Sequence, residues 1–216
     1  MSAVSEWIVR EYFEASGYLV GQPRKHTVPG RQKTAEEEVD LVVFNPRVAE
    51  HKAPERMVWT TPDLANVARA IVGVRGWHTE RFYSSTFEQQ PDILKFVEPE
   101  SLRFAQRLLG PGPTAKILCL PRLPASGQLK TATMEFLRAK GIDGVISFET
   151  MLVELIGHVD ANKNYEKSDL LQIMRILKNY GMFKEPQLDF FAGRRGRKGK
   201  TNTAEPSAGE EAPSEA

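Results

Sequence analysis

Two apolar runs on either side of a proline-containing insert place the tightest limits on the fold of this chain. In the first run, residues 36–44, valine and leucine alternate with acidic residues, the period of two expected of a strand with one buried face. The second run, residues 67–74, is apolar apart from Arg69 and continues into Arg75-Gly76-Trp77-His78. We therefore predict two strands, the second of them buried and ending in polar residues.

Acidic residues share one side of the first predicted strand. Glu36, Glu38 and Asp40 are two positions apart, so their side chains would point to the same face, opposite the apolar row. An acidic face next to a charged strand end outlines a metal or phosphate site. An ordinary solvated strand face would give the same pattern, and the sequence leaves both interpretations open.

The composition is that of a soluble globular protein. With 216 residues, 41% hydrophobic and 26% charged, the chain is long enough for one domain with its own core. Cys119 is the only cysteine, which excludes an internal disulfide and a cysteine zinc cage. The first residues lack the pattern of a signal peptide, and no apolar run reaches the roughly 20 residues of a membrane span. We expect a cytoplasmic protein with no membrane partner.

The chain is predicted to divide into a domain, residues 1–183, and a tail, residues 184–216. From Gly193 onward, five lysines and arginines precede four glutamates among Gly, Ser, Pro and Ala, a composition typical of disorder. Without that stretch, the totals of 29 basic and 28 acidic residues leave 24 of each. The basic cluster could contact phosphates or simply keep the chain soluble.

The remaining segments predict alternating helices and strands. We expect a helix at 2–16, a strand at 18–20, a basic loop at 22–34 and a helical region at 84–110 that Pro91 and Pro99 interrupt. Short strands at 116–120 and 144–148 alternate with helices at 128–140, 150–159 and 168–179. Because the last strands are continuously apolar, the sheet should be covered on both faces. The predicted fold class is α/β, a single domain with a mixed sheet flanked by helices.

This order of elements, with an acid on the second strand and a charged residue ending the third, resembles the PD-(D/E)XK nuclease superfamily, which has the restriction-endonuclease-like fold. The resemblance covers residues 2–150 and implies an αβββαβ core. In that family a strand Asp and a following Asp/Glu-x-Lys hold Mg²⁺, often with a Glu of the first helix. The resemblance implies catalytic residues Asp40, Glu6 and, in place of the lysine, Arg75.

The chain departs from the family motif at two positions. Gly73 stands where the second acid should be, and Arg75 replaces the lysine. A guanidinium can hold a phosphate by two hydrogen bonds but stays protonated, so it serves poorly in proton transfer. A carboxylate from another position, Glu38 or Glu80, could complete the site. We therefore predict Asp40 and Glu38 as metal ligands and Mg²⁺ as cofactor, on condition that the site is functional.

Nucleic-acid contacts are expected from basic and aromatic residues near the same strand end. Arg75 and the loop residues Lys25, Arg31 and Lys33 would contact phosphates. Trp77 could stack on a base, although a tryptophan after a buried strand also commonly packs at the rim of the core.

Three hypotheses remain. The chain is a metal-dependent nuclease (a phosphodiesterase), the same fold with catalysis lost and nucleic-acid or protein binding retained, or a protein-interaction domain. The missing acid favours the second over the first, and the balanced charge favours the third. We predict a nucleic-acid-binding protein of nuclease fold, with DNA as partner, and leave activity, a protein partner and a homodimer open.

Overall fold

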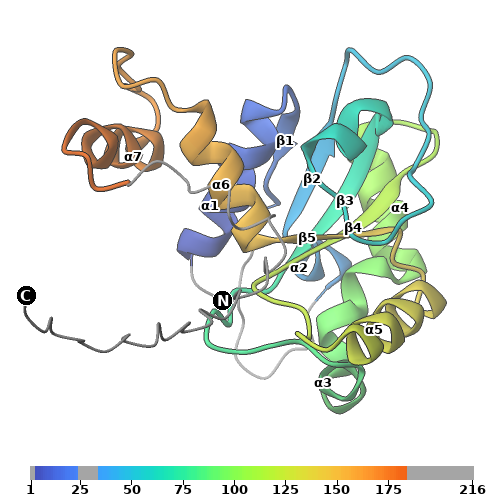
Figure 1. Ribbon diagram of the computed structural model, residues 1–216. Coiled ribbons are helices and arrows are strands. Elements are labelled where there is room, and N and C mark those ends of the chain that lie inside the picture. Colours follow the sequence, from blue (N-terminus) through green and yellow to red (C-terminus); the bar gives the residue numbers. More distant parts are fainter. Residues whose placement is uncertain (1–2, 24–33, 184–216) are drawn as a thin grey trace, which may run out of the picture. The chain divides into compact units, whose positions relative to one another are not determined.

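Helices cover both faces of a five-stranded mixed sheet in the computed structural model (Figure 1). The structure describes residues 3–23 and 34–183. The chain divides into two units, Met1–Phe183 and Lys184–Ala216. The predicted tail and most of the predicted basic loop lie outside the described residues. The α/β class, the mixed sheet and the helices on both faces are confirmed.

The strands follow one another across the sheet in chain order. They are β1 (Leu19–Gly21), β2 (Leu41–Phe44), β3 (Arg69–Val74), β4 (Ala115–Leu120) and β5 (Gly144–Ser147). β1, β2 and β3 are antiparallel neighbours, whereas β3, β4 and β5 are parallel. As a result β3, β4 and β5 end, and β2 begins, at the same edge of the sheet. We call it the carboxyl edge.

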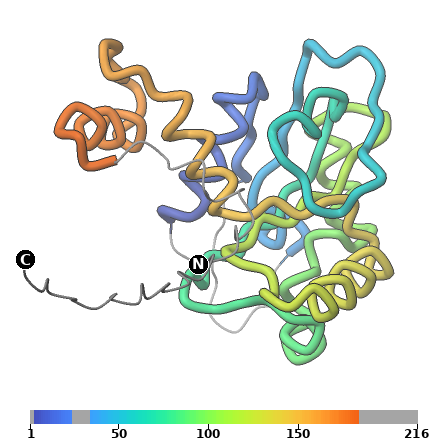
Figure 2. Tube along the Cα trace, viewed as in Figure 1, coloured from blue at the N-terminus to red at the C-terminus, as the bar shows by residue number. Residues whose placement is uncertain are grey.

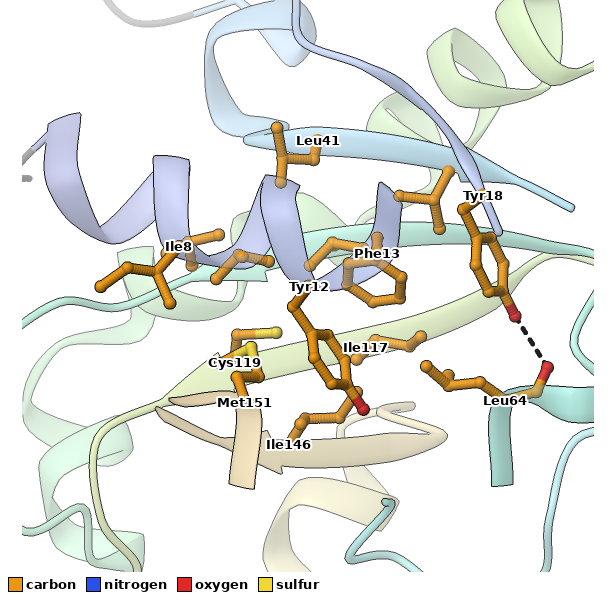
Figure 3. Close-up of a cluster of buried hydrophobic side chains, with 14 of the residues drawn as sticks. Ile8, Tyr12, Phe13, Tyr18, Leu41, Leu64, Ile117, Cys119, Ile146 and Met151 are labelled. Atoms are coloured by element: carbon orange, nitrogen blue, oxygen red, sulfur yellow. Dashed lines mark hydrogen bonds between the residues drawn. The ribbon is translucent and has the colours of Figure 1, made fainter. Parts of the chain in front are cut away.

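One face of the sheet is covered by α1 (Ala3–Ala15) and α6 (Phe148–His158), which contact each other. Figure 3 shows Ile8, Tyr12 and Phe13 of α1 pointing toward the strands, at the helical spacing that the sequence predicted. The Tyr18 hydroxyl donates to the Leu64 carbonyl oxygen at 2.8 Å, which fixes the chain after α1. The last helix, α7 (Asp169–Asn179), packs against α1.

The opposite face carries the segment between β3 and β4 and the helix after β4. It comprises α3 (Ser84–Gln89), the 3₁₀ helix η2 (Pro91–Val97), α4 (Pro99–Leu109) and α5 (Gly127–Ala139). Pro91 and Pro99 each stand at the start of a new helix, where a missing N–H costs no hydrogen bond, as the sequence predicted. Phe96 of η2 is fully buried on this face.

The insert between β2 and β3 covers the outer edge of β5 and contains the 3₁₀ helix η1 (Thr61–Asn66). Val145 donates to the Met57 carbonyl oxygen at 2.6 Å, and Trp59 donates back to the Val145 carbonyl oxygen at 2.8 Å. Trp59 is fully buried, and a Cβ on Gly144 would lie 2.2 Å from its ring. The insert can be followed in Figure 2 between light blue and teal.

The predicted strand at residues 36–44 is wrong in its first half. Residues Ala35–Glu38 form a short helix, α2, and the strand begins only at Leu41. The Thr34 backbone N–H donates to the Glu37 carboxylate at 2.6 Å, the Thr-x-x-Glu arrangement of a helix start. Glu36 and Glu38 therefore do not share a strand face with Asp40.

Candidate functional site at the carboxyl edge

Asp40 and Arg75 stand next to each other where β2 begins and β3 ends. β2 and β3 are antiparallel with Leu41 opposite Val72, so one step further the register places Asp40 opposite Gly73. Strand alternation puts Asp40, Gly73 and Arg75 on the face covered by η2 and α4. The structure thus brings together three of the positions that the resemblance singled out.

The two charged side chains form a buried ion pair. Asp40 Oδ2 lies 2.8 Å from Arg75 Nη1 and also accepts a hydrogen bond from the Val74 backbone N–H at 2.7 Å. The side chains are only 1% and 6% exposed, for Asp40 and Arg75 respectively. A carboxylate held this way has its charge neutralised inside the protein.

The guanidinium of Arg75 is held by further protein groups. Nη1 donates to the Val74 carbonyl oxygen at 2.7 Å, and Nη2 donates to the Ile93 carbonyl oxygen of η2. The Phe96 ring lies against it, 5.7 Å from the guanidinium carbon to the ring centroid. Sequence reasoning predicted that Arg75 contacts phosphate or takes part in catalysis, whereas the structure directs its donors to Asp40 and to backbone carbonyls.

Phe96 fills the space beside Gly73. A Cβ added to Gly73 would lie 2.5 to 2.8 Å from three atoms of the Phe96 ring, which is 0% exposed. A carboxylate side chain at this position, as the family motif requires, therefore has no room unless Phe96 moves. Phe96 was not among the predicted site residues, because its place in a helical apolar run does not indicate that it will pack against Gly73.

Glu38, the second predicted metal ligand, lines a different pocket. This pocket has a volume of about 450 Å³ and lies between α2, η2 and α4, with Asp92, Lys95 and Glu98 among its lining residues. Lys95 Nζ lies 2.7 Å from Asp92 Oδ1, and Asp40 does not line the pocket. Glu80, the other carboxylate considered, is exposed in the turn after β3.

Glu6, the predicted helix carboxylate, lies in the first turn of α1 and accepts a hydrogen bond from Gln22 Nε2 at 2.6 Å. α1 packs on the face of the sheet opposite the one that Asp40 shares. Among residues 3–23 and 34–183, no group of three or more His, Cys, Asp or Glu side chains could hold a metal ion. The residues at the motif positions do not fit Mg²⁺, because one carboxylate is paired with arginine and the second is missing.

The chain leaving β3 is tied to both helices of the other face. Ser5 Oγ of α1 lies 3.1 Å from His78 Nε2, and the His78 ring packs edge-on against Phe148 of α6 at 4.7 Å between centroids. A Cβ on Gly76 would lie 2.2 Å from Ser5 Oγ, so only glycine allows this approach. Both chain neighbours of Trp77, Gly76 and His78, therefore contact the helices of that face.

Trp77 reaches the surface of the carboxyl edge, where the residue is 37% exposed. Its ring stacks on buried Phe82, with 5.6 Å between centroids and 17° between planes. Arg81, which precedes Phe82 in the chain, and Arg122, after β4, are both exposed. The Phe82 backbone N–H donates to the Arg122 carbonyl oxygen at 3.0 Å, which brings the exits of β3 and β4 together.

Other predicted contacts lie elsewhere or cannot be placed. Lys25, Arg31 and Lys33 are outside the described residues. Arg81 and Arg122 were not among the predicted site residues. The available signal was that each follows the end of a predicted strand, at 67–74 and 116–120 respectively. Cys119 is fully buried in β4, and burial raises the pKa of its thiol, which disfavours the reactive thiolate.

The comparisons with known proteins assign no family. No family model matches the chain, and neither a curated protein nor a solved structure matches it. No helix in the part of the chain that the structure describes is long and apolar enough to cross a membrane.

Proposed function

We propose that this chain is a catalytically inactive protein of the restriction-endonuclease-like fold that binds nucleic acid at the carboxyl edge. The observation that carries the proposal is the buried ion pair between Asp40 and Arg75, 2.8 Å apart, beside a glycine whose side-chain space Phe96 occupies. The pair stands where the PD-(D/E)XK motif would hold its metal.

The connectivity of the domain supports the fold part of the proposal. A helix, α1, precedes three antiparallel strands, and a helical segment then leads to β4, which is parallel to β3. This is the αβββαβ order that the resemblance implies, with the acid at the start of the second strand and the cation at the end of the third.

The chemistry of the pair supports the loss of catalysis. Metal-dependent phosphodiester hydrolysis needs carboxylates that are open to a hydrated divalent cation. Asp40 is 1% exposed, and its Oδ2 accepts hydrogen bonds from Arg75 and from the Val74 N–H. A cation could bind Asp40 only by displacing Arg75, which would leave the guanidinium buried without its partner carboxylate.

Binding of nucleic acid is supported by the residues on the surface of the same edge. Exposed Arg81 and Arg122 provide cations for phosphate, and Trp77 provides an aromatic face. Ligands of α/β sheets with parallel strands commonly bind at the carboxyl ends of those strands. Because the body of the chain is nearly neutral, we expect moderate affinity that depends on local contacts.

The test is binding and cleavage of labelled DNA and RNA with Mn²⁺ or Mg²⁺, measured by fluorescence anisotropy and by gel analysis. We expect binding without cleavage, and weaker binding by Arg81→Ala/Arg122→Ala. The matched control is Arg103→Ala on α4, an arginine whose side chain is 67% exposed. Metal-dependent cleavage that Asp40→Asn removes would overturn the loss of catalysis, and absence of binding would overturn the nucleic-acid function.

A further inference from the structure

We infer that Trp77 stacks on an unpaired base, so that the carboxyl edge prefers single-stranded nucleic acid over a duplex. This inference rests on the proposed function and names the substrate class of the same surface. Its starting point is that Trp77 is the exposed end of a column of aromatic rings that runs into the core.

The column has four members. Trp77 stacks on Phe82, Phe82 contacts Phe87 at 5.7 Å and 36°, and Phe87 stacks on Phe136 of α5 at 6.2 Å and 19°. Phe82 and Phe87 are 0% and 1% exposed, whereas Trp77 is 37% exposed. At the other end, Phe136 is half-buried and Lys140 Nζ lies 5.5 Å from its ring centroid. Trp77 is therefore the more exposed end of the column, where a planar ligand could extend it.

Contacts hold the backbone on both sides of Trp77, and its indole stacks on Phe82, before any ligand binds. The Glu80 backbone N–H donates to the Trp77 carbonyl oxygen at 3.0 Å, which closes a turn after the tryptophan. Gly76 is pressed against Ser5 on one side of the loop, and Phe82 is bonded to Arg122 on the other. A fixed aromatic face loses little conformational entropy on binding, which favours affinity.

The chemistry of stacking selects an unpaired base. Every base has a π-face that can stack on an aromatic side chain, but within a duplex both faces are covered by neighbouring base pairs. Single strands expose those faces, and their phosphates need nearby cations. Arg81, next to Phe82 in the chain, is exposed and donates from Nη1 to the Leu123 carbonyl oxygen at 3.1 Å. Arg122 provides a second exposed guanidinium at the next strand end.

The experiment compares a labelled oligothymidylate with the same strand paired to its complement, using the full chain and anisotropy. We expect tighter binding of the single strand, and a loss of about 5- to 150-fold in Trp77→Ala, the range found for single stacked bases. Trp77→Leu keeps an apolar contact with Phe82 but removes the aromatic face, and should lose affinity as well. Tyr180→Ala is the control, because Tyr180 is an aromatic residue with 77% of its surface exposed, at the end of α7.

A second readout is the tryptophan fluorescence of the wild type, part of which a base stacked on Trp77 should quench. Trp77→Phe keeps the fluorescence of Trp7 and Trp59 but should lose this quenching. Unchanged single-strand affinity in Trp77→Leu, or duplex binding as tight as single-strand binding, would overturn the inference while leaving the proposed function in place. Failure of the wild type to bind either form would instead overturn the proposed function itself.

Discussion

At the scale of single residues, the carboxyl edge contains a buried ion pair and a buried aromatic ring beside it. Asp40 and Arg75 neutralise each other under Phe96, which also fills the space that an acid at position 73 would need. Substitutions can test separately how much the ion pair and the contact of Phe96 with Gly73 contribute to the free energy of unfolding.

Breaking the ion pair from one side should be costly. Arg75→Met leaves the Asp40 carboxylate buried without its cation, and we expect a loss of about 3–5 kcal/mol in the free energy of unfolding. Asp40→Asn/Arg75→Met removes both charges and keeps an acceptor for the Val74 N–H, so it should be more stable than Arg75→Met alone. Urea unfolding measures both. Equal stability of the two variants would show that the charges do not depend on each other.

Filling the space at position 73 should also be costly. Gly73→Ala places a methyl group against the Phe96 ring, and we expect a loss of about 1–3 kcal/mol, part of which Phe96→Leu should restore. Gly127→Ala on α5 is the matched control, because nothing lies within 4 Å of a Cβ there. If Gly73→Ala were as stable as this control in thermal unfolding, the proposed role of Phe96 would be wrong.

At the scale of elements, the sequence predicted β3 well, whereas it began the strand before the insert several residues too early. Val67–Val74 reads as a buried strand because β3 has neighbours on both sides and helices on both faces. The helix α2 was not predicted, because the alternation in residues 36–44 indicates a strand; the Thr34-x-x-Glu37 pattern is the local signal of the helix start. The role of Trp59 depends on pairing with β5, some 85 residues later in the chain, which no local pattern contains.

The insert should stabilise the domain through Trp59. Trp59→Ala removes a fully buried side chain, and we expect a loss of about 3–5 kcal/mol in the free energy of unfolding. Gly144→Ala should also destabilise, since its methyl group would meet the same ring. Denaturant titration of both variants is the measurement. A wild-type midpoint for Trp59→Ala would mean that the insert does not contribute to the core.

His51, in the insert, should make the stability of the domain depend on pH. His51 Nδ1 accepts hydrogen bonds from the backbone N–H groups of Ala68, at 3.2 Å, and Arg69, at 3.4 Å. Burial lowers the pKa of His51 from its ordinary value of 6.5, an effect that Asp143 partly opposes. Above pH 6.5, His51 is neutral in both the folded and the unfolded state. Below pH 6.5, the unfolded state binds a proton at His51 before the folded state does, so the free energy of unfolding should fall with falling pH.

His51→Gln keeps a side-chain acceptor but cannot take up the proton. Its free energy of unfolding should therefore fall less steeply than that of the wild type between pH 6.5 and pH 5, when both are measured by urea titration. Parallel pH curves for the two proteins would exclude His51 as the cause of the slope.

At the scale of the whole domain, the carboxyl edge combines a closed interior with an open surface. The α/β class could be predicted from the sequence, and so could the proximity of Asp40, Gly73 and Arg75, because strand order and spacing determine which residues become neighbours. It could not predict that the two charges would pair, since that depends on burial by η2. Nor could it predict that Trp77 would end a column of rings, since that depends on the packing of α3 and α5.

The central claim is that this edge binds nucleic acid without cutting it. The most direct measurement is an anisotropy titration of labelled single-stranded DNA with Mn²⁺ present, followed by gel analysis of the same samples. We predict saturable binding by the wild type, weaker binding by Arg81→Ala/Arg122→Ala, and intact DNA throughout. Cleavage of the DNA that needs Mn²⁺ and disappears in Asp40→Asn would contradict the account.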